Sequence, residues 1–372
     1  MLTPVTVRSR VLIAMSGGVD SSVAAARLVD AGLDVVGVTL HLWDYPDDAP
    51  AKSRCCAPED IHDAKLVASH LGIPHYAFDR RELFEAKVVA PFVEAYLEGR
   101  TPSPCVDCNR WIKVPELMGI ADRLGADTVA TGHYARVVAD EDSQPRLHRG
   151  RDLLKDQSYF LYMLDPSLLH RLRLPLGESH KSEVRAEAKR RGLPAADKGE
   201  SQELCFVAAD GYARFVQQRA PTRIRPGAIE DGDGRRVGSH EGIHRYTRGQ
   251  RRGLGIALGH PAFVTDIDAA RNVVRVGNAE QASANRARIC GTTWNDDVVF
   301  PLRAKLKVRS QHEGTMAILE QNADQGAEPG VVARFERLVR GVSPGQVAVA
   351  FDGDRVVGGG IIVSAWTEEQ ER

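Results

Sequence analysis

The sequence predicts an α/β fold with a doubly wound, mainly parallel sheet, followed by a small central domain and a C-terminal antiparallel β-barrel. From residue 11 to about 140, apolar β-prone runs alternate with helical segments, which is typical of a parallel sheet covered by helices. Near residue 210 the composition shifts towards turn-forming residues, and short alternating runs follow from about 284. These changes place the domain boundaries at 1–209, 210–283 and 284–372.

The first domain begins with an apolar run at residues 11–14, which we expect to be a buried strand. A Ser-Gly-Gly turn follows, and the Ala/Leu/Val-rich segment after it has a helical composition that Gly32 ends. The other expected elements are strands at 35–40, 75–78 and 127–131 and helices at 59–71 and 81–97. Because ligands of such sheets bind at the carboxyl ends of the strands, the Ser-Gly-Gly turn lies where a site is expected.

The second half predicts two smaller modules. Pro221, Pro226 and a Gly/Asp-rich stretch at 227–242 indicate turns in a small, separate domain. The expected barrel strands are 303–308, 331–335, 346–351 and 355–363. Asp352-Gly353-Asp354 between the last two is a hairpin signal.

Composition limits the class of protein. The 372 residues carry a formal net charge of -1, so any nucleic-acid binding has to rest on local basic patches. No run of about 18 apolar residues occurs and the first ten residues lack the apolar core of a signal peptide, so we expect a cytoplasmic protein without a membrane partner. The six cysteines are then thiols for catalysis, metal or sulfur chemistry, not a disulfide framework.

The loop Ser16-Gly17-Gly18-Val19-Asp20-Ser21 has the features of a phosphate cradle. Glycines let the backbone approach an anion, and the N–H groups of a helix start attract negative charge. The Gly-Lys-Ser/Thr ending of a Walker loop is missing, and an ordinary glycine turn is the alternative. The loop resembles the PP-loop of ATP pyrophosphatases, which cleave ATP between the α and β phosphates. That resemblance implies that Asp20 helps to hold Mg²⁺, and that the pyrophosphate oxygens contact Ser16, Gly17, Gly18, Ser21 and Ser22.

Cys105 and Cys108 form a Cys-x-x-Cys motif after two prolines, which we expect to keep the segment out of a helix until Asn109. Because Arg110 and Lys113 follow closely, a thiol here is expected to have a lowered pKa and to be a good nucleophile.

The other cysteines leave alternatives open. Cys205 lies far along the chain, and Cys105, Cys108 and Cys205 together are candidates for an iron–sulfur cluster. Structural zinc on the Cys-x-x-Cys pair is less well supported, because a four-ligand site usually draws on a second close Cys/His pair. Cys290 is expected to be a small core residue, and Cys55 and Cys56 suggest no role.

With these residues in place, the chain resembles the bacterial tRNA-specific 2-thiouridylases nearly from end to end. The motifs that carry the resemblance are 16–21, 105–109, 131–136, 155–161, 201–206, 247–255 and 343–346. The family implies an adenine nucleotide α-hydrolase-like PP-loop domain and a reaction that uses ATP and Mg²⁺. ATP activates the C2 oxygen of the wobble uridine, position 34 of tRNA, as an adenylate, and sulfur from a cysteine persulfide then replaces that oxygen. A sulfur-donor or relay protein is the implied second partner.

The resemblance also implies roles for individual residues. Cys205 carries the persulfide and Cys108 attacks it, which frees sulfide or leaves a Cys108–Cys205 disulfide. The implied ATP-binding positions are Ala14, Met15, Ser16, Gly17, Gly18, Val19, Asp20, Ser21, Leu40 and Gly132. The implied tRNA contacts are Ser103, Pro104 and Cys105 at the target base, and His133, Lys155, Asp156, Gln157, Arg309 and Gln346 elsewhere.

Two departures from the family pattern matter. Some members have Asn-Pro-Asp where this chain has Ser103-Pro104-Cys105, so an acid/base role of that missing carboxylate is unfilled or passes to Asp107. Some members also have an Arg-Tyr pair where this chain has Arg309-Ser310. The alternatives are another PP-loop AMP-forming ligase, an iron–sulfur-dependent thiolation enzyme, and a non-catalytic RNA-binding or metal-sensing protein.

Overall fold

The computed structural model describes residues 9–44, 58–140, 142–199, 204–208, 210–321 and 329–368. They divide into two compact units, and each is described by itself. The first unit contains residues 9–88 and 105–208, and the second contains 89–104 and 210–368. The stretch 89–104 therefore belongs with the later part of the chain.

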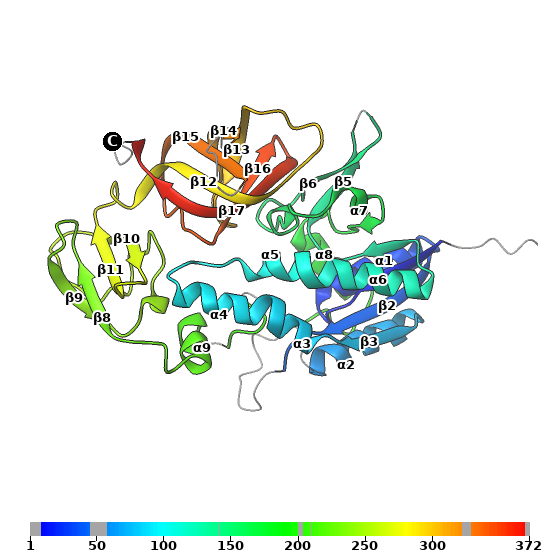
Figure 1. Ribbon diagram of the computed structural model, residues 1–372. Coiled ribbons are helices and arrows are strands. Elements are labelled where there is room, and N and C mark those ends of the chain that lie inside the picture. The colour runs from blue at the N-terminus through cyan, green and yellow to red at the C-terminus, as the bar shows by residue number, and fades with distance from the viewer. Residues whose placement is uncertain are drawn as a thin grey trace, which may run out of the picture. The chain divides into compact units, whose positions relative to one another are not determined.

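The first unit is built on a five-stranded sheet in which every pairing is parallel, as predicted (Figure 1). Its strands in spatial order are β3 (His75–Asp79), β2 (Asp34–His41), β1 (Arg10–Ala14), β4 (Thr128–Ala130) and β7 (Leu172–Arg173). The chain passes from β1 outward to β2 and β3 and then returns to place β4 on the other side of β1. This reversal next to β1 is the position at which open parallel sheets bind ligands.

Helices cover the sheet. The helices of this unit are α1 (Val19–Asp30), α2 (Pro58–Leu71), α3 (Arg81–Phe84), α5 (Pro104–Cys108), α6 (Val114–Leu124), α7 (Pro166–Leu169) and α8 (Lys181–Arg190). Buried side chains of α1, α2 and α8 form one core with Val11 and Ile13 of β1. Contacts of α6 with β1 and β4 lie outside that core, so helices cover both faces of the sheet. An antiparallel hairpin, β5 (Ala135–Ala139) and β6 (Pro145–Arg149), and a 3₁₀ turn at Ser158–Phe160 complete the described elements of the unit.

Two π-helical turns differ from the expected regular helices. The stretch expected as one helix at 81–97 consists of α3, a π-helical turn at Glu85–Val89 and α4 (Ala90–Leu97). A second π-helical turn at Asn109–Lys113 precedes α6. Each turn comes directly before a helix with proline in its first turn, Pro91 or Pro115. A widened turn accommodates the ring and the missing N–H of a proline within a continuing helix.

The expectation that the Cys-x-x-Cys motif lies before its helix is wrong. Helix α5 begins at Pro104, so Cys105 and Cys108 both lie within it. Proline is favoured in the first turn of a helix, where its missing N–H costs no hydrogen bond. The second proline therefore begins the helix that it was expected to prevent.

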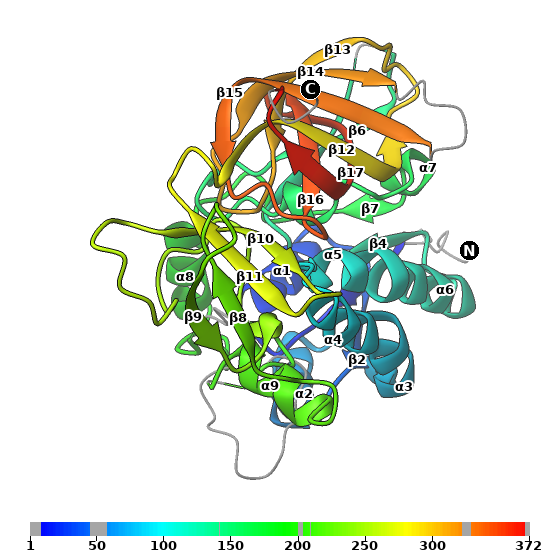
Figure 2. The same cartoon turned by 60° about the vertical axis from the view of Figure 1, so that its left-hand side comes forward.

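The second unit contains a small four-stranded sheet and a barrel (Figure 2). The small sheet has the order β10 (Phe263–Asp268), β11 (Val273–Gly277), β8 (Gly227–Glu230) and β9 (Arg236–His240). A turn at 231–234 joins β8 and β9, so the Gly/Asp-rich stretch holds two strands as well as the expected turn. Helices α4 and α9 (Tyr212–Arg219) contact each other, and a 3₁₀ turn at Ile243–Arg245 packs on both.

The barrel at the end of the chain is antiparallel and closed, as predicted. Its strands are β12 (Ser283–Trp294), β13 (Leu302–Lys307), β14 (Thr315–Gln321), β15 (Gly330–Arg340), β16 (Val347–Asp352) and β17 (Arg355–Trp366). The hydrogen-bonded order is β12-β15-β14-β13-β16-β17, and pairing of β12 with β17 closes the ring. The expected hairpin is present: Asp352 pairs with Arg355, so its loop consists of two residues, Gly353 and Asp354. Inward-facing aliphatic side chains fill the interior.

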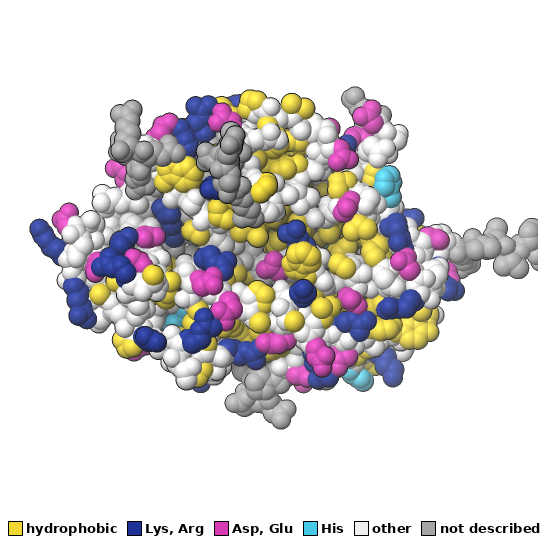
Figure 3. Space-filling view, viewed as in Figure 1, with side chains coloured by type: hydrophobic (Ala, Val, Ile, Leu, Met, Phe, Trp, Pro, Cys, Tyr) yellow, Lys and Arg dark blue, Asp and Glu magenta, His cyan; other side chains and the backbone are white. Residues whose placement is uncertain are grey.

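The surface shows no single-sign field on the face drawn in Figure 3. Lys and Arg side chains are interleaved there with Asp and Glu, in keeping with the formal net charge of -1. Within the described ranges, no helix has the length and apolar character needed to cross a membrane.

Candidate active site

The Ser-Gly-Gly loop occupies the carboxyl end of β1 and is held by its own hydrogen bonds. The Ser21 hydroxyl accepts the Ser16 N–H at 3.2 Å and donates to the Gly18 carbonyl at 3.1 Å. Gly17 has φ +68°, and a Cβ there would lie 2.4 Å from the Asp60 carbonyl oxygen of α2. No side chain caps the start of α1, so the first-turn N–H groups of this helix remain able to bind an anion.

The residues after β4 close the other side of the loop. A Cβ on Gly132 would lie 2.9 Å from the Ser21 backbone nitrogen, so this glycine lets the two segments touch. His133 is half-buried, and its Nδ1 lies 2.8 Å from the Thr131 hydroxyl. Burial, with a smaller contribution from Lys113, lowers the pKa of His133 to about 3, so the imidazole is neutral at pH 7.

The predicted ATP positions therefore gather at the carboxyl ends of three adjacent strands. Ala14 to Ser21 follow β1, Leu40 is buried near the end of β2, and Gly132 follows β4. Met15 joins β1 to β2, because its N–H donates to the Val38 carbonyl at 2.8 Å and its carbonyl accepts the Thr39 hydroxyl at 2.7 Å.

Asp20 has two partners that the sequence did not reveal. The Lys181 ammonium group lies 2.7 Å and 2.6 Å from its two carboxylate oxygens, and the Tyr134 hydroxyl donates to Oδ1 at 2.8 Å. The Lys181 side chain is 12% exposed and that of Asp20 is 33% exposed. The Lys181 ammonium group therefore occupies the position next to the carboxylate that was predicted to help hold Mg²⁺. Mg²⁺ usually binds through one or two carboxylates plus substrate phosphates, so Asp20 fits that role when nucleotide is present.

Cys108 lies buried in α5, and its predicted low pKa is wrong for this structure. Burial raises the pKa of the Cys108 thiol to about 11, and the opposing effect of Lys113 is smaller. The neighbouring Cys105 and Asp107 raise it further. The sequence showed the nearby cation but not the loss of water around the sulfur, which dominates. Cys105 is exposed.

Asp107 is half-buried in α5, directly before Cys108. Burial raises the pKa of Asp107 to about 6, although Arg110 lowers it in part. Besides burial, the charge of Asp107 also raises the pKa of Tyr162, and that of Arg110 lowers it. The buried Tyr162 hydroxyl has no hydrogen-bond partner within the described ranges. A carboxyl group with a pKa near neutrality can accept or donate a proton at pH 7. The raised pKa fits the acid/base role considered for Asp107.

Cys205 is half-buried, and the residue after it anchors it to the sheet. The Phe206 ring packs against Trp43 at 6.2 Å and Phe84 at 5.6 Å between ring centroids. Trp43 lies just beyond the end of β2, so Cys205 is held near that end. Lys198, before Cys205, pairs with Asp60 and Asp63 in the first turns of α2.

The two cysteine segments have different neighbours within the first unit. Cys205 is held beside the end of β2, whereas Cys108 and His133 both experience the Lys113 charge near the end of β4. Residues 201–203 of the 201–206 motif lie outside the described residues, as do Cys55 and Cys56. Cys290 is buried in the barrel, as expected.

The described part of the chain contains no group of three or more His, Cys, Asp or Glu side chains arranged to hold a metal ion. Cys105, Cys108 and Cys205 are thus not gathered into one such group among the described residues.

The residues predicted to contact tRNA fall into two groups. Asp156 is turned inward, where it accepts the Arg149 guanidinium at 2.9 Å and the Ser158 N–H at 3.1 Å. The Gln157 amide oxygen accepts the Tyr134 N–H at 2.9 Å. The side chains of Asp156 and Gln157 thus hold the loop in shape. Lys155, which precedes them, is half-buried, and Leu154 before it is exposed.

The other predicted tRNA contacts belong to the second unit. Gln346 donates its amide to the carbonyls of Thr101 and Pro102 at 3.1 Å each, which holds the chain just before Ser103 and Pro104. Arg309 is exposed on the barrel, and its guanidinium donates to the Arg340 carbonyl at 3.3 Å.

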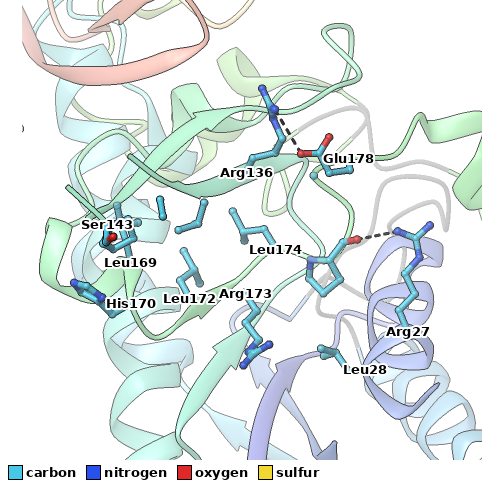
Figure 4. A pocket seen from close by; sticks show the side chains of 15 residues that line it. Arg27, Leu28, Arg136, Ser143, Leu169, His170, Leu172, Arg173, Leu174 and Glu178 are labelled. Carbon is cyan, nitrogen blue, oxygen red and sulfur yellow. Dashed lines mark hydrogen bonds and ion pairs between the residues drawn. The ribbon is translucent and has the colours of Figure 1, made fainter. Parts of the chain in front are cut away.

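A cavity of about 650 Å³ in the first unit is separate from these residues. Figure 4 shows Arg136 and Glu178 pointing toward each other at its rim, and Arg27 donates to the Pro175 carbonyl at 2.8 Å. None of the predicted ATP-binding or thiol residues lines it. It is not the site at which these residues gather.

Comparison with known proteins places the chain in one family. Three family models match in order: the tRNA methyl transferase HUP domain at 9–209, the tRNA methyl transferase PRC-barrel domain at 213–278, and the aminomethyltransferase beta-barrel domain at 287–362. Solved structures are more distant. A 4-thiouridine synthetase–RNA complex with bound ATP is 17% identical with a TM-score of 0.35, and the match covers 58% of this chain and 51% of that chain. A match this weak adds nothing to the family assignment.

Curated relatives match over almost their whole length. The tRNA-specific 2-thiouridylase MnmA of Sorangium cellulosum is 62% identical over 96% of this chain and 93% of its own. MnmA of Chloroflexus aurantiacus is 46% identical over 95% of this chain and 98% of its own. MnmA of Methylorubrum populi is 46% identical over 95% of this chain and 93% of its own. The chain therefore belongs to the tRNA-specific 2-thiouridylase family, whose members are tRNA sulfurtransferases.

Proposed function

We propose that this protein uses ATP to convert the C2 carbonyl of the wobble uridine of tRNA into a thiocarbonyl, giving 2-thiouridine. The observation that carries the proposal is the arrangement at the end of β1. A phosphate-type loop with a one-third exposed carboxylate, Asp20, follows β1. Cys205 is held beside the end of the neighbouring strand β2, and Cys108 in α5 feels the same Lys113 charge as His133 after β4. An ATP-binding loop alone would fit many ligases, whereas the same loop with two free thiols, Cys108 and Cys205, in the same unit fits sulfur transfer.

The first step activates the uridine. A carbonyl oxygen is a poor leaving group, and transfer of AMP to the C2 oxygen, with loss of pyrophosphate from Mg·ATP, makes it a good one. The loop N–H groups and the Ser16 and Ser21 hydroxyls face the departing pyrophosphate in this proposal, and Asp20 holds the magnesium that arrives with ATP. Lys181 then leaves Asp20 and pairs with a phosphate oxygen, which places its charge where negative charge develops.

The second step transfers sulfur. A sulfur-donor or relay protein supplies a persulfide on Cys205. Cys108 attacks the inner sulfur of that persulfide, its proton passes to Asp107, and the terminal sulfur leaves as hydrosulfide. Hydrosulfide adds to C2 of the adenylated uridine, and AMP departs with the original oxygen. The enzyme is left with a Cys108–Cys205 disulfide, which an external dithiol reduces before the next turnover.

The raised thiol pKa shapes this step. Because the pKa of Cys108 is about 11, the group is a thiol at pH 7 and needs a base as its bond to sulfur forms. Asp107, with a pKa of about 6, is mostly ionised at pH 7 and lies beside it in sequence. Burial of the thiol until the target base arrives also protects it from oxidants.

The proposal is tested with wild-type protein, Mg·ATP, a persulfide donor and unmodified tRNA, followed by nucleoside analysis for 2-thiouridine. We expect product from the wild type and none from Cys205→Ala or Cys108→Ala. Both variants are expected to keep tRNA-dependent ATP–pyrophosphate exchange, which shows that they fold and activate the base. Normal turnover of Cys205→Ala with the persulfide donor would contradict the assignment of Cys205. A PP-loop ligase that uses ammonia or an amino acid would tolerate both substitutions.

A further inference from the structure

A second, smaller cavity lies on the barrel, within the second unit. Its volume is about 180 Å³. Residues from the turn between β13 and β14 and from the end of β15 form its wall, which consists of Arg309, His312, Thr315, Arg337, Leu338, Val339 and Arg340. It is smaller than the roughly 300–1,000 Å³ pockets that take drug-sized ligands. It therefore has room for a small group and not for a whole nucleotide.

The cavity is strongly cationic. Arg309, Arg337 and Arg340 are exposed, and none of them has a carboxylate partner among the residues that the structure describes. This contrasts with Arg303 on the same barrel, which donates two hydrogen bonds to Glu336 at 3.0 Å and 2.7 Å.

An irregularity in β15 brings these arginines together. Between the pairings Ala284↔Val339 and Arg286↔Arg334, β15 uses more residues than β12 does. Such a bulge re-aims side chains that a regular strand would send to alternate faces. Arg337 and Leu338 lie in the extra stretch, next to the Thr315 end of β14.

Two polar groups in the wall, the buried Thr315 and the half-buried His312, support an anionic ligand. The Thr315 side chain belongs to a residue that is 4% exposed, and its hydroxyl has no hydrogen-bond partner in the described part of the chain. His312 accepts the Val308 N–H on Nδ1 at 3.4 Å, so the proton of a neutral ring is on Nε2. Both groups can donate a hydrogen bond to a ligand oxygen.

The charges around His312 also favour an anionic ligand in this cavity. Burial lowers the pKa of His312 to about 4, and the positive charges of Arg309, Arg337 and Lys307 lower it too, while Glu313 opposes them. The imidazole is thus a neutral donor at pH 7 among cations. An oxyanion in the cavity would supply the missing negative charge.

We propose that this cavity binds one backbone phosphate of the tRNA, through Arg309, Arg337 and Arg340 with the Thr315 hydroxyl and His312 Nε2–H as neutral donors. The inference rests on the proposed function for the identity of the RNA. Of these five side chains, only Arg309 is expected from the sequence to contact tRNA. A phosphodiester fits the size of the cavity, and arginine side chains bind phosphate oxygens through two parallel hydrogen bonds.

The test measures binding of unmodified tRNA as a function of salt. Neutralising one phosphate contact lowers the slope of log K against log salt by about one. We expect Arg337→Gln and Arg309→Gln each to reduce the slope by about that amount and to weaken binding at least about fivefold at low salt. Arg303→Gln, which removes the same charge from the same barrel, is the matched control and is expected to keep the wild-type slope.

Thr315→Val is a second variant that keeps the shape of the side chain. It removes an unpaired buried hydroxyl, so the fold is expected to tolerate it. We expect weaker tRNA binding with an unchanged salt slope, because a neutral donor is lost and no charge. If Arg337→Gln behaves like Arg303→Gln and Thr315→Val binds like wild type, the inference is overturned.

Two further measurements distinguish failure of the cavity proposal from failure of the proposed function. 2-Thiouridine formation is expected to be unchanged in Arg303→Gln, whose side chain lies outside the cavity. Product from the wild type together with identical salt slopes would reject this cavity and leave the proposed function standing. Altered salt slopes in the arginine variants, together with no 2-thiouridine from the wild type, would reject the proposed function and leave the phosphate site standing. Tight binding of inorganic phosphate alone, with normal tRNA binding by Arg337→Gln, would assign the cavity to a free anion and overturn the proposal.

Discussion

Replacing Lys181 with methionine, Lys181→Met, tests how the ATP site handles its charges. The substitution keeps a chain of similar length and removes the ammonium group that lies 2.6 Å and 2.7 Å from the Asp20 oxygens. In the proposed reaction that ammonium group moves to a phosphate oxygen when Mg²⁺ takes its place at Asp20. The variant should therefore lose stabilisation of the departing pyrophosphate.

The size of the loss follows from the surroundings. At 12% exposure the Lys181 side chain is shielded from water, so its hydrogen bonds to charged oxygens belong to the stronger class of about 1.5–3 kcal/mol. At 1.36 kcal/mol for each factor of ten, this predicts a loss of about 10- to 100-fold in the rate of adenylation. Asp20 keeps its Tyr134 hydrogen bond, so the folded protein should survive the change.

The assay is tRNA-dependent exchange of labelled pyrophosphate into ATP, with a thermal melt on the same preparations. Lys189→Met is the matched control, because Lys189 and its partner Asp197 are 65% and 92% exposed and 3.4 Å apart. We expect the control to exchange at the wild-type rate. Full activity of Lys181→Met beside an inactive Asp20→Asn would refute the reasoning, since Lys181 would then only fill the magnesium position between turnovers.

Other predictions follow from single groups. With Asp107 as the base, the rate of thiolation should rise about tenfold per pH unit below its pKa of about 6 and level off above it; Asp107→Asn should be slow and lack this inflection in a pH–rate profile. The raised pKa also means that the folded state binds the proton more tightly than the unfolded chain, so Asp107 costs stability as pH rises from about 4 to 6. In urea melts, Asp107→Asn should gain up to about 3 kcal/mol over wild type at pH 7 and nothing at pH 4. Gly132→Ala should raise the KM for ATP about tenfold or more, because its Cβ would meet the Ser21 nitrogen at 2.9 Å; Gly119→Ala, where a Cβ meets nothing within 4 Å, should leave the KM unchanged and raise stability by about 0.5–1 kcal/mol.

The fold was predictable where local chemistry decides it. The Ser-Gly-Gly turn between a buried strand and a helix, and the two-residue hairpin after Asp352, use residues whose backbone preferences act over a few positions. The alternation of strands and helices indicated the parallel sheet. Local chemistry also explains the main error in this part, because Pro104 was taken as a barrier to a helix that it begins.

The site was less predictable because it depends on burial and on distant contacts. Lys181 meets Asp20 across 161 positions, and no periodicity in the sequence encodes that pairing. The pKa of Cys108 depends on how much water reaches the sulfur, which Arg110 and Lys113 in the sequence do not reveal. The packing of Phe206 on Trp43, which holds Cys205 near the sheet, is likewise a tertiary contact.

The most direct measurement is peptide mapping under non-reducing conditions after one turnover of persulfide-loaded enzyme with Mg·ATP and unmodified tRNA, with no dithiol present. The account predicts a peptide that joins Cys108 to Cys205 by a disulfide, in an amount equal to the 2-thiouridine formed. Formation of 2-thiouridine while both thiols stay unlinked would contradict it.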